Sequence, residues 1–297
     1  MISFPPFRVL NMKQLRCSSR AMPPYTKPLL RVRVAVVLFA VLAAATAASA
    51  EEPTAAATAG FNSYIAALES RIDRQHRSQD GFIDSVLSDP DNRAKLQRGE
   101  PIVERIRPSG GPALPGATLY HWRGTAFVPG VKVADYERLM ENFADFPKNF
   151  APEIVRAKVF SRKNQGGRTF IKASFRVKQR HIITVVMDID YDVVLARLDA
   201  QHGYSASRST RVTEIADAGT NKEHAMSGGD QHGFLWRLNS YWSYEERDGG
   251  LYMQIESVSL ARSIPAELDW AINPFVETVP RESLEFTLQA TSKALKK

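Results

Sequence analysis

Residues 233–261, GFLWRLNSYWSYEERDGGLYMQIESVSLA, contain two alternating runs separated by Asp248-Gly249. Asp-Gly favours a two-residue hairpin loop, because both central positions of a type I′ turn need a positive φ. This loop predicts the register of the two strands. On one face, the pairs are Tyr244 with Met253, Trp242 with Ile255, Ser240 with Ser257, Leu238 with Ser259 and Trp236 with Ala261. On the other face, the pairs are Glu245 with Tyr252, Ser243 with Gln254 and Tyr241 with Glu256. One face is therefore apolar with small serines at its middle, and the other is polar. The agreement between two strands supports both the turn and the faces.

Outward from this hairpin, the hydrophobic pattern predicts a series of long strands. Strands are expected at 118–128, 153–162, 167–179, 181–194 and 203–215, with a helix at 133–143 and helical spacing at 266–296 that Pro274 and Pro280 interrupt. Consecutive strands favour antiparallel pairing, with the helices on one face of the sheet. The sequence thus predicts an α+β fold in which a curved antiparallel sheet of about six to seven strands wraps on a long C-terminal helix.

A helical N-terminal extension is predicted over residues 61–116, after a flexible linker at 51–60. Apolar residues with helical spacing are Phe61, Tyr64, Ile65, Leu68 and Ile72, and a second short helix is expected at 82–87. Asp89-Pro90-Asp91 is expected to end that helix. The extension either packs on the main domain, 117–297, or contacts a membrane. Its mixed acidic and basic polar face favours packing.

The first 50 residues have the parts of a secretory signal peptide. Lys27, Arg31 and Arg33 precede an uncharged run, 34–50, that ends in Ala-Ser-Ala. We expect cleavage near Ala50 and export to the periplasm or medium; the alternative is an uncleaved membrane anchor. The only cysteine, Cys17, precedes the run, so the mature chain has no disulfide.

Charge and motifs exclude several classes of function. The leader holds seven Lys and Arg and no acid, so the other 32 basic residues match the 32 acidic ones, and we predict no nucleic-acid partner. No nucleophile elbow, metal-binding histidine pair or phosphate loop is present, so no catalytic residue, metal or cofactor is assigned. Asp188, Asp190 and Asp192 suggest a calcium site, but alternation on a strand favours a solvated face paired with bases. His224 and His232 flank a Gly-rich segment that is either a lid or an ordinary loop.

The serines among large aromatic residues on the apolar hairpin face suggest a pocket between sheet and C-terminal helix. The alternative is that bulky helix residues fill this space. Cavity candidates are Phe175, Met187, Tyr191, Trp236, Leu238, Ser240, Trp242, Ile255, Ser257, Trp270 and Phe275. Arg237, Asn239, Tyr241 and Glu256 would be polar anchors for a ligand only if another register turned them inward. Otherwise Tyr241 and Glu256 form either an acid/base pair or a structural hydrogen bond.

Three motifs resemble those of the START-like (SRPBCC) superfamily of lipid-transfer and polyketide cyclase-like proteins. They are GFLWRLNSYW at 233–242, GLYMQIE at 250–256 and VPRESL at 279–284. The resemblance covers about 117–296, looks like an exported bacterial branch and implies a helix-grip fold that holds a hydrophobic small molecule. From this we expect an exported protein that binds a lipid-like or aromatic molecule. The alternatives are a cyclase or aromatase-type enzyme using the same pocket, and a solid-core structural protein.

Overall fold

The computed structural model describes residues 52–78, 81–83, 85–107, 114–180, 184–264 and 266–297, with backbone only for 85 and 266–277. All of them belong to one compact unit, Ala45–Lys297. The signal-peptide prediction lies outside the described residues. The elements are α2 (Ala55–His76), η1 (Ser85–Ser88), α3 (Pro90–Gln97), β1 (Ile102–Arg105), β2 (Ala117–Pro129), α4 (Val133–Glu141), η2 (Phe143–Asp145), α5 (Phe146–Asn149), β3 (Ile154–Gln165), β4 (Arg168–Arg180), β5 (Thr184–Arg197), β6 (His202–Ala216), β7 (His224–Ala225), η3 (Gly228–Asp230), β8 (Arg237–Arg247), β9 (Gly250–Arg262) and α6 (Ala266–Leu295).

The strands form one antiparallel sheet in the order β1-β2-β9-β8-β6-β5-β4-β3, and β7 pairs with β6. The α+β helix-grip prediction is confirmed, and all seven predicted strands are present. β1 and β7 are additional. They have four and two residues, which is too short for an alternating pattern to be recognised in the sequence.

The central hairpin has the predicted register. Tyr244 pairs with Met253 and Ser240 with Ser257, and both turn residues have positive φ, 56° at Asp248 and 73° at Gly249. The prediction is wrong only at its start, because β8 begins at Arg237. Trp236 precedes the strand, and its backbone N–H donates to the carbonyl of Leu260.

Helix α2 begins earlier than predicted. It starts at Ala55, so residues 55–60 are helical and not part of a flexible linker. The side chain of Thr54 caps the helix by accepting a hydrogen bond from the backbone N–H of Ala57, and Ala57 is fully buried. Pro90 likewise opens a helix, α3, with Asp89 as its N-cap, because proline is well tolerated in the first turn.

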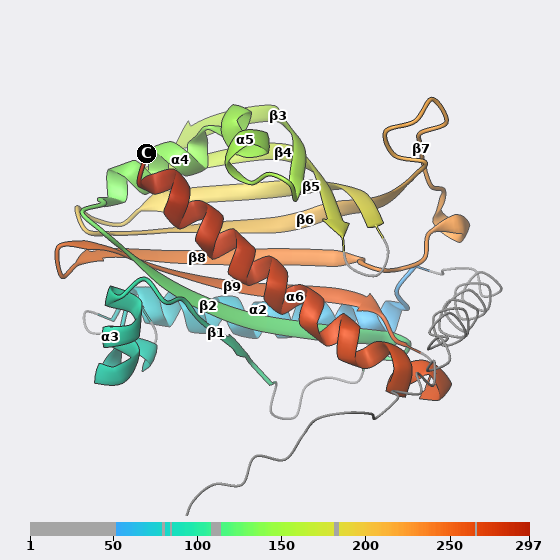
Figure 1. Cartoon of the computed structure of the whole chain (residues 1–297), viewed down its shortest axis with the longest axis horizontal. Coiled ribbons are helices and arrows are strands. Elements are labelled where there is room, and N and C mark those ends of the chain that lie inside the picture. The colour runs from blue at the N-terminus through green and yellow to red at the C-terminus, as the bar shows by residue number, and fades with distance from the viewer. Residues whose placement is uncertain (1–51, 79–80, 84, 108–113, 181–183, 265) are drawn as a thin grey trace, which may run out of the picture. The chain divides into compact units, whose positions relative to one another are not determined.

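Helices cover both faces of the sheet (Figure 1). We call the face toward α6 the inner face and the face toward α2 the outer face. Leu284 and Leu288 of α6 pack against Gly124 of β2, where a Cβ atom would lie 2.6 Å from Leu288 Cδ1. On the outer face, the predicted apolar stripe of α2 is buried against Val258 and Leu260 of β9. The α2 part of the extension thus packs on the main domain.

Helix α6 is continuous from Ala266 to Leu295, so Pro274 and Pro280 do not break it. Each proline removes one backbone hydrogen bond, while the later turns are held on β2 by Leu284 and Leu288. Trp270 and Phe275 lie on this helix, at positions whose side chains fall outside the described part of the structure. Within the described residues, no helix has both the length and the apolar content that a bilayer crossing requires.

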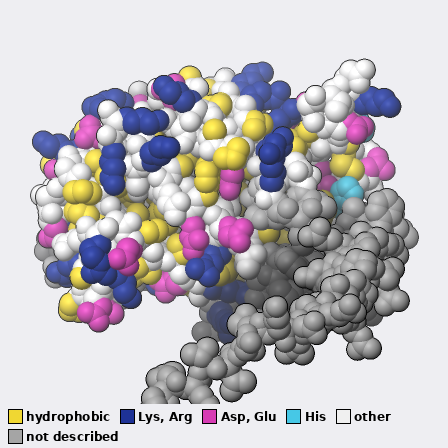
Figure 2. Space-filling view, viewed as in Figure 1, with side chains coloured by type: hydrophobic (Ala, Val, Ile, Leu, Met, Phe, Trp, Pro, Cys, Tyr) yellow, Lys and Arg dark blue, Asp and Glu magenta, His cyan; other side chains and the backbone are white. Residues whose placement is uncertain are grey.

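Strand β3 ends the strand order at one edge of the sheet. Most of its residues are exposed, and they include Arg156, Lys158, Arg162 and Lys163. Two register shifts, near Arg156 and Ser161, interrupt its pairing with β4. On the face seen in Figure 2, basic and acidic side chains are scattered among one another.

Candidate functional site

A row of serines crosses the middle of the inner face. Ser207, Ser240 and Ser257 are direct neighbours on β6, β8 and β9. Val193 of β5 pairs with Ser207 at one end of the row, and Trp122 of β2 pairs with Ser257 at the other. Three short polar side chains thus stand side by side between the larger apolar Val193 and Trp122, because side chains of one face are neighbours in adjacent strands.

The serines of the row differ in exposure from the residues at its two ends. Ser207, Ser240 and Ser257 are partly exposed, although α6 crosses the same face, whereas Val193 and Trp122 are buried. Within the described part of the chain, two buried side-chain polar atoms have no hydrogen-bond partner, Trp122 Nε1 and the Tyr136 hydroxyl. The unpaired indole N–H at the end of the row is a donor that a ligand could satisfy.

Further along the inner face, aromatic side chains fill the space. Phe143 and Phe146 each stack on Phe175, with ring centroids 5.4 Å apart in both pairs. Phe150 and Tyr191 complete this cluster, and burial raises the pKa of Tyr191 above its usual range. The pattern of strand residues predicted Phe175 and Tyr191, but it could not show that η2 and α5 supply rings that fill their side of the space.

The other predicted cavity residues are divided among the clusters. Trp242 and Ile255 lie in the cluster that Leu284 and Leu288 close, and Met187 and Leu238 lie with the aromatic cluster. Trp236 packs with the outer-face cluster instead, because it precedes the β8 ladder. Of the predicted cavity residues, Ser240 and Ser257 line the row, while Trp122 and Ser207 were missed.

The polar hairpin face is buried under α2. Glu256 is 4% exposed, and its carboxylate contacts His121 Nε2 at 2.9 Å and Arg71 Nη2 through both oxygens. His121 Nδ1 lies 2.7 Å from the Tyr64 hydroxyl. Burial alone would raise the pKa of Glu256, but the hydrogen bond with His121 and the charge of Arg71 lower it. The four groups form one continuous hydrogen-bond network between α2 and the sheet.

In this network a hydroxyl, an imidazole and a carboxylate follow one another in the order that serves nucleophilic catalysis. Two observations oppose that role. Burial and the negative charge of Glu256 raise the pKa of Tyr64, which disfavours an activated oxygen. His121 is 2% exposed, so a substrate has no access to it. The arrangement fits a structural contact that fixes α2 on the sheet.

The remaining proposed polar anchors also lie away from the inner face. The Tyr241 hydroxyl donates to Glu69 at 2.8 Å, and Arg208 Nε donates to the same oxygen at 2.6 Å. Asn239 donates to the Tyr241 hydroxyl, while Arg237 donates to the backbone carbonyl of Trp236. Tyr241 and Glu256 are cross-strand neighbours as predicted, but the structure shows their side chains bonded to other residues, Glu69 and Asn239 for Tyr241 and His121 and Arg71 for Glu256, instead of to each other.

Two further sequence motifs have ordinary partners. Asp188, Asp190 and Asp192 form ion pairs with Arg176, Arg211 and Lys172, as expected for a strand face among bases. His232 Nδ1 lies 2.8 Å from the buried carboxylate of Glu214, which holds the Gly-rich segment to β6. Among the described residues, no group of three His, Cys, Asp or Glu side chains is placed to hold a metal ion.

No family profile matches the chain, and no curated protein matches it either. Among solved structures, a START superfamily protein from Mycobacterium smegmatis is similar, with 10% identity, a TM-score of 0.39 and coverage of 59% of this chain and 97% of that one. A STAR-related lipid transfer protein from Xanthomonas axonopodis has 14% identity, a TM-score of 0.36 and coverage of 66% and 99%. An aromatase/cyclase from Streptomyces sp. R1128 has 11% identity, a TM-score of 0.38 and coverage of 60% and 94%. The likeness to these three structures concerns the backbone fold alone.

Proposed function

We propose that this chain is an exported protein that binds a hydrophobic small molecule, lipid-like or aromatic, between the inner face of the sheet and α6. The row of partly exposed serines beneath α6 carries the proposal. The apolar side chains of Val193 and Trp122 border the row at its two ends, so a ligand resting on the serines would contact apolar groups on both sides. Burial of apolar surface contributes about 25 cal/mol per Å² before the costs of association.

The serines and Trp122 supply the polar part of the site. Ligand pockets combine apolar walls with a few groups that fix orientation. The hydroxyls of Ser207, Ser240 and Ser257 can donate or accept, and Trp122 Nε1 can only donate. A ligand with one hydroxyl or carbonyl oxygen near its centre would match this arrangement better than a pure hydrocarbon.

The neutral fluorescent probe N-phenyl-1-naphthylamine tests the proposal. Ser240→Phe fills the middle of the row, and we expect it to weaken or abolish probe binding. Ser161→Phe places the same ring on exposed β3 and is the matched control. An unfolding midpoint close to that of the unchanged protein shows that each variant is folded. Absence of probe binding to the unchanged protein, or equal binding to Ser240→Phe, would contradict the proposal.

Protein recovered from its own cells tests ligand and export together. Native mass spectrometry should show a co-purified hydrophobic molecule, and the protein should be in the periplasmic or extracellular fraction with a new N-terminus at Glu51. Ligand-free protein would count against the carrier function. Retention of residues 1–50 with the membrane fraction would instead support the anchor alternative for the leader.

A further inference from the structure

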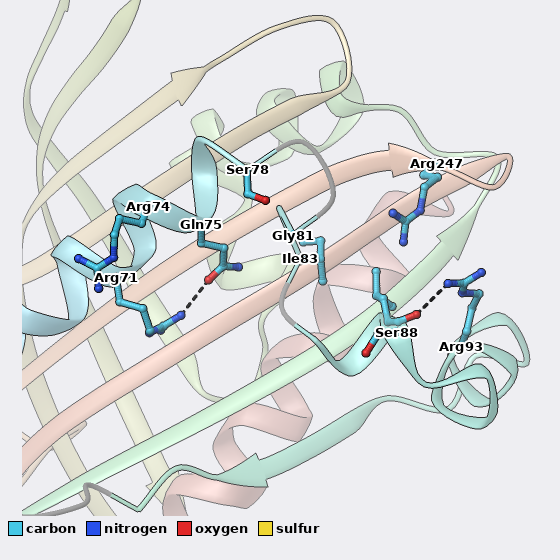
Figure 3. Close-up of a pocket in the computed structure, with 10 residues that line it drawn as sticks. Arg71, Arg74, Gln75, Ser78, Gly81, Ile83, Ser88, Arg93 and Arg247 are labelled. Atoms are coloured by element: carbon cyan, nitrogen blue, oxygen red, sulfur yellow. Dashed lines mark hydrogen bonds between the residues drawn. The ribbon is translucent and has the colours of Figure 1, made fainter.

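A cavity of about 720 Å³ lies on the α2 side of the sheet, apart from the inner-face site (Figure 3). Its walls come from the end of α2, the segment that follows it, the start of α3 and the end of β8. The described lining residues are Arg71, Arg74, Gln75, Ser78, Gly81, Ile83, Leu87, Ser88, Arg93 and Arg247. Its volume is in the range of pockets that bind small organic molecules.

The described lining contains four arginines and no acidic residue. Arg71 and Arg74 belong to α2, Arg93 to α3 and Arg247 to β8. Figure 3 shows the two α2 arginines on one side of the cavity and the other two on the opposite side, with Gly81 and Ile83 between them. Cations from three elements thus surround one space, and their mutual repulsion is relieved when an anion enters.

The acids that accompany these arginines lie outside the lining. Arg71 contacts the buried Glu256, and Arg247 Nη1 donates to Glu245 at 3.1 Å. Those carboxylates offset two of the four charges.

Among the described residues, no carboxylate forms an ion pair with the other two arginines. Arg93 Nη2 donates to the neutral carbonyl of Leu87 at 2.8 Å. Arg74 is exposed, and no side chain in the described part of the chain pairs with it. Because each guanidinium has five N–H donors, these two arginines retain most of theirs for a ligand.

We propose that this cavity binds a small organic anion with phosphate or carboxylate groups. Guanidinium groups suit both anions, since the planar fork can donate two parallel hydrogen bonds to their oxygens. The separation of the arginines into two pairs favours a ligand with an acidic group at each end. Ile83 and Leu87 provide an apolar wall for the segment between those groups, and Gln75, Ser78 and Ser88 provide neutral polar contacts.

Calorimetric titration of the full mature protein at low salt tests this site. The probes are citrate, inorganic pyrophosphate and phosphatidylcholine vesicles that contain phosphatidic acid. Arg74→Gln and Arg93→Gln remove the two cavity charges that have no carboxylate partner among the described residues, and we expect each to weaken binding by about tenfold or more, since hydrogen bonds to charged groups contribute about 1.5–3 kcal/mol. Arg138→Gln removes an exposed arginine on α4 and should leave the affinity unchanged.

The outcomes separate the sources of the anion. Binding of citrate or pyrophosphate that the cavity variants weaken supports the proposal with a soluble ligand. Binding of the vesicles alone, weakened by the same variants, supports it with a lipid headgroup. The proposal is overturned if no probe binds the unchanged protein, or if Arg138→Gln weakens binding as much as Arg74→Gln. The N-phenyl-1-naphthylamine assay reports the inner-face site separately, so the two proposals can fail independently.

Discussion

His76, at the end of α2, should make the stability of the protein depend on pH. Its ring stacks on Phe82 at 4.8 Å and lies 5.0 Å from Tyr204, and its Nε2 lies 2.7 Å from Ser243 Oγ. Burial is the main cause that lowers the pKa of His76 from 6.5 to about 4; the charge of Arg71 acts in the same direction, and Asp73 and Glu256 oppose it. The native state therefore holds a neutral imidazole under conditions in which the unfolded chain takes up a proton.

The sign and size of the effect follow from this difference in pKa. As the pH falls below 6.5, the unfolded state gains a proton that the native state does not bind, so the free energy of unfolding decreases until the native pKa near 4 is reached. For these two values the loss between about pH 7 and about pH 5 is about 2 kcal/mol. His76→Gln keeps a polar group that can bond to Ser243 but does not titrate, so it should lack this loss.

Urea unfolding of both proteins at about pH 7 and about pH 5 measures the effect. The relevant quantity is the change in unfolding free energy with pH in the unchanged protein minus the change in the variant. Taking this difference removes the contributions of other groups, including Glu153, whose raised pKa acts in the opposite direction. His224→Gln, at an exposed site, is the matched control. Identical pH dependence in His76→Gln and the unchanged protein would refute the reasoning.

Three further predictions concern stability. Gly203→Ala places a Cβ 2.3 Å from Tyr244 Cε2, so it should lower the free energy of unfolding in urea by about 1–3 kcal/mol; an unchanged midpoint would contradict this. Arg71→Met leaves the buried Glu256 carboxylate without its cation and should cost about 3 kcal/mol, and adding Glu256→Gln should recover part of that loss if the charge is the cause. Burial raises the pKa of Glu153 to about 7, so the stability contributed by its protonated form is lost as the pH rises through that value. Between about pH 5 and about pH 8 the free energy of unfolding should therefore decrease, and Glu153→Gln should remove about 1–2 kcal/mol of that decrease. Urea unfolding at the two pH values measures it.

The sequence predicts the fold best where a turn and two alternating strands constrain each other. The Asp248-Gly249 turn determined the register of β8 and β9, and the two faces followed from it. The same local reasoning predicted the buried stripe of α2, because a helix with spaced apolar residues must bury them. Such features depend on neighbours a few residues apart.

The features that could not be predicted depend on contacts between distant segments. The burial of the polar hairpin face could not be predicted, because nothing local shows that Arg71, 185 residues from Glu256, covers it. A buried polar face of a sheet can carry the same residue types as a solvent-exposed one, provided that its polar groups find hydrogen-bond partners in the element that covers it.

The candidate site shows the same limit. Ser240 and Ser257 were recognised within one hairpin, but Ser207 and Trp122 join them only through the pairing of β6 with β8 and β2 with β9. The arginine cavity was missed for a similar reason. Arg71, Arg93 and Arg247 are far apart in sequence and share no motif, so only the packing of α2, α3 and β8 brings them together.

Strand β3 has a consequence for the protein at high concentration. A long open strand offers its unsatisfied backbone groups to any similar chain, and this is how many sheets begin to polymerise. On β3, pairing with the same strand of a second copy would bring lysines and arginines close to one another. The two register shifts near Arg156 and Ser161 also make the strand irregular, which opposes a continuous row of backbone hydrogen bonds along it. The charge and the irregular pairing of β3 thus oppose edge-to-edge association, and chemical neutralisation of its lysines should make this strand more prone to pair with a second copy.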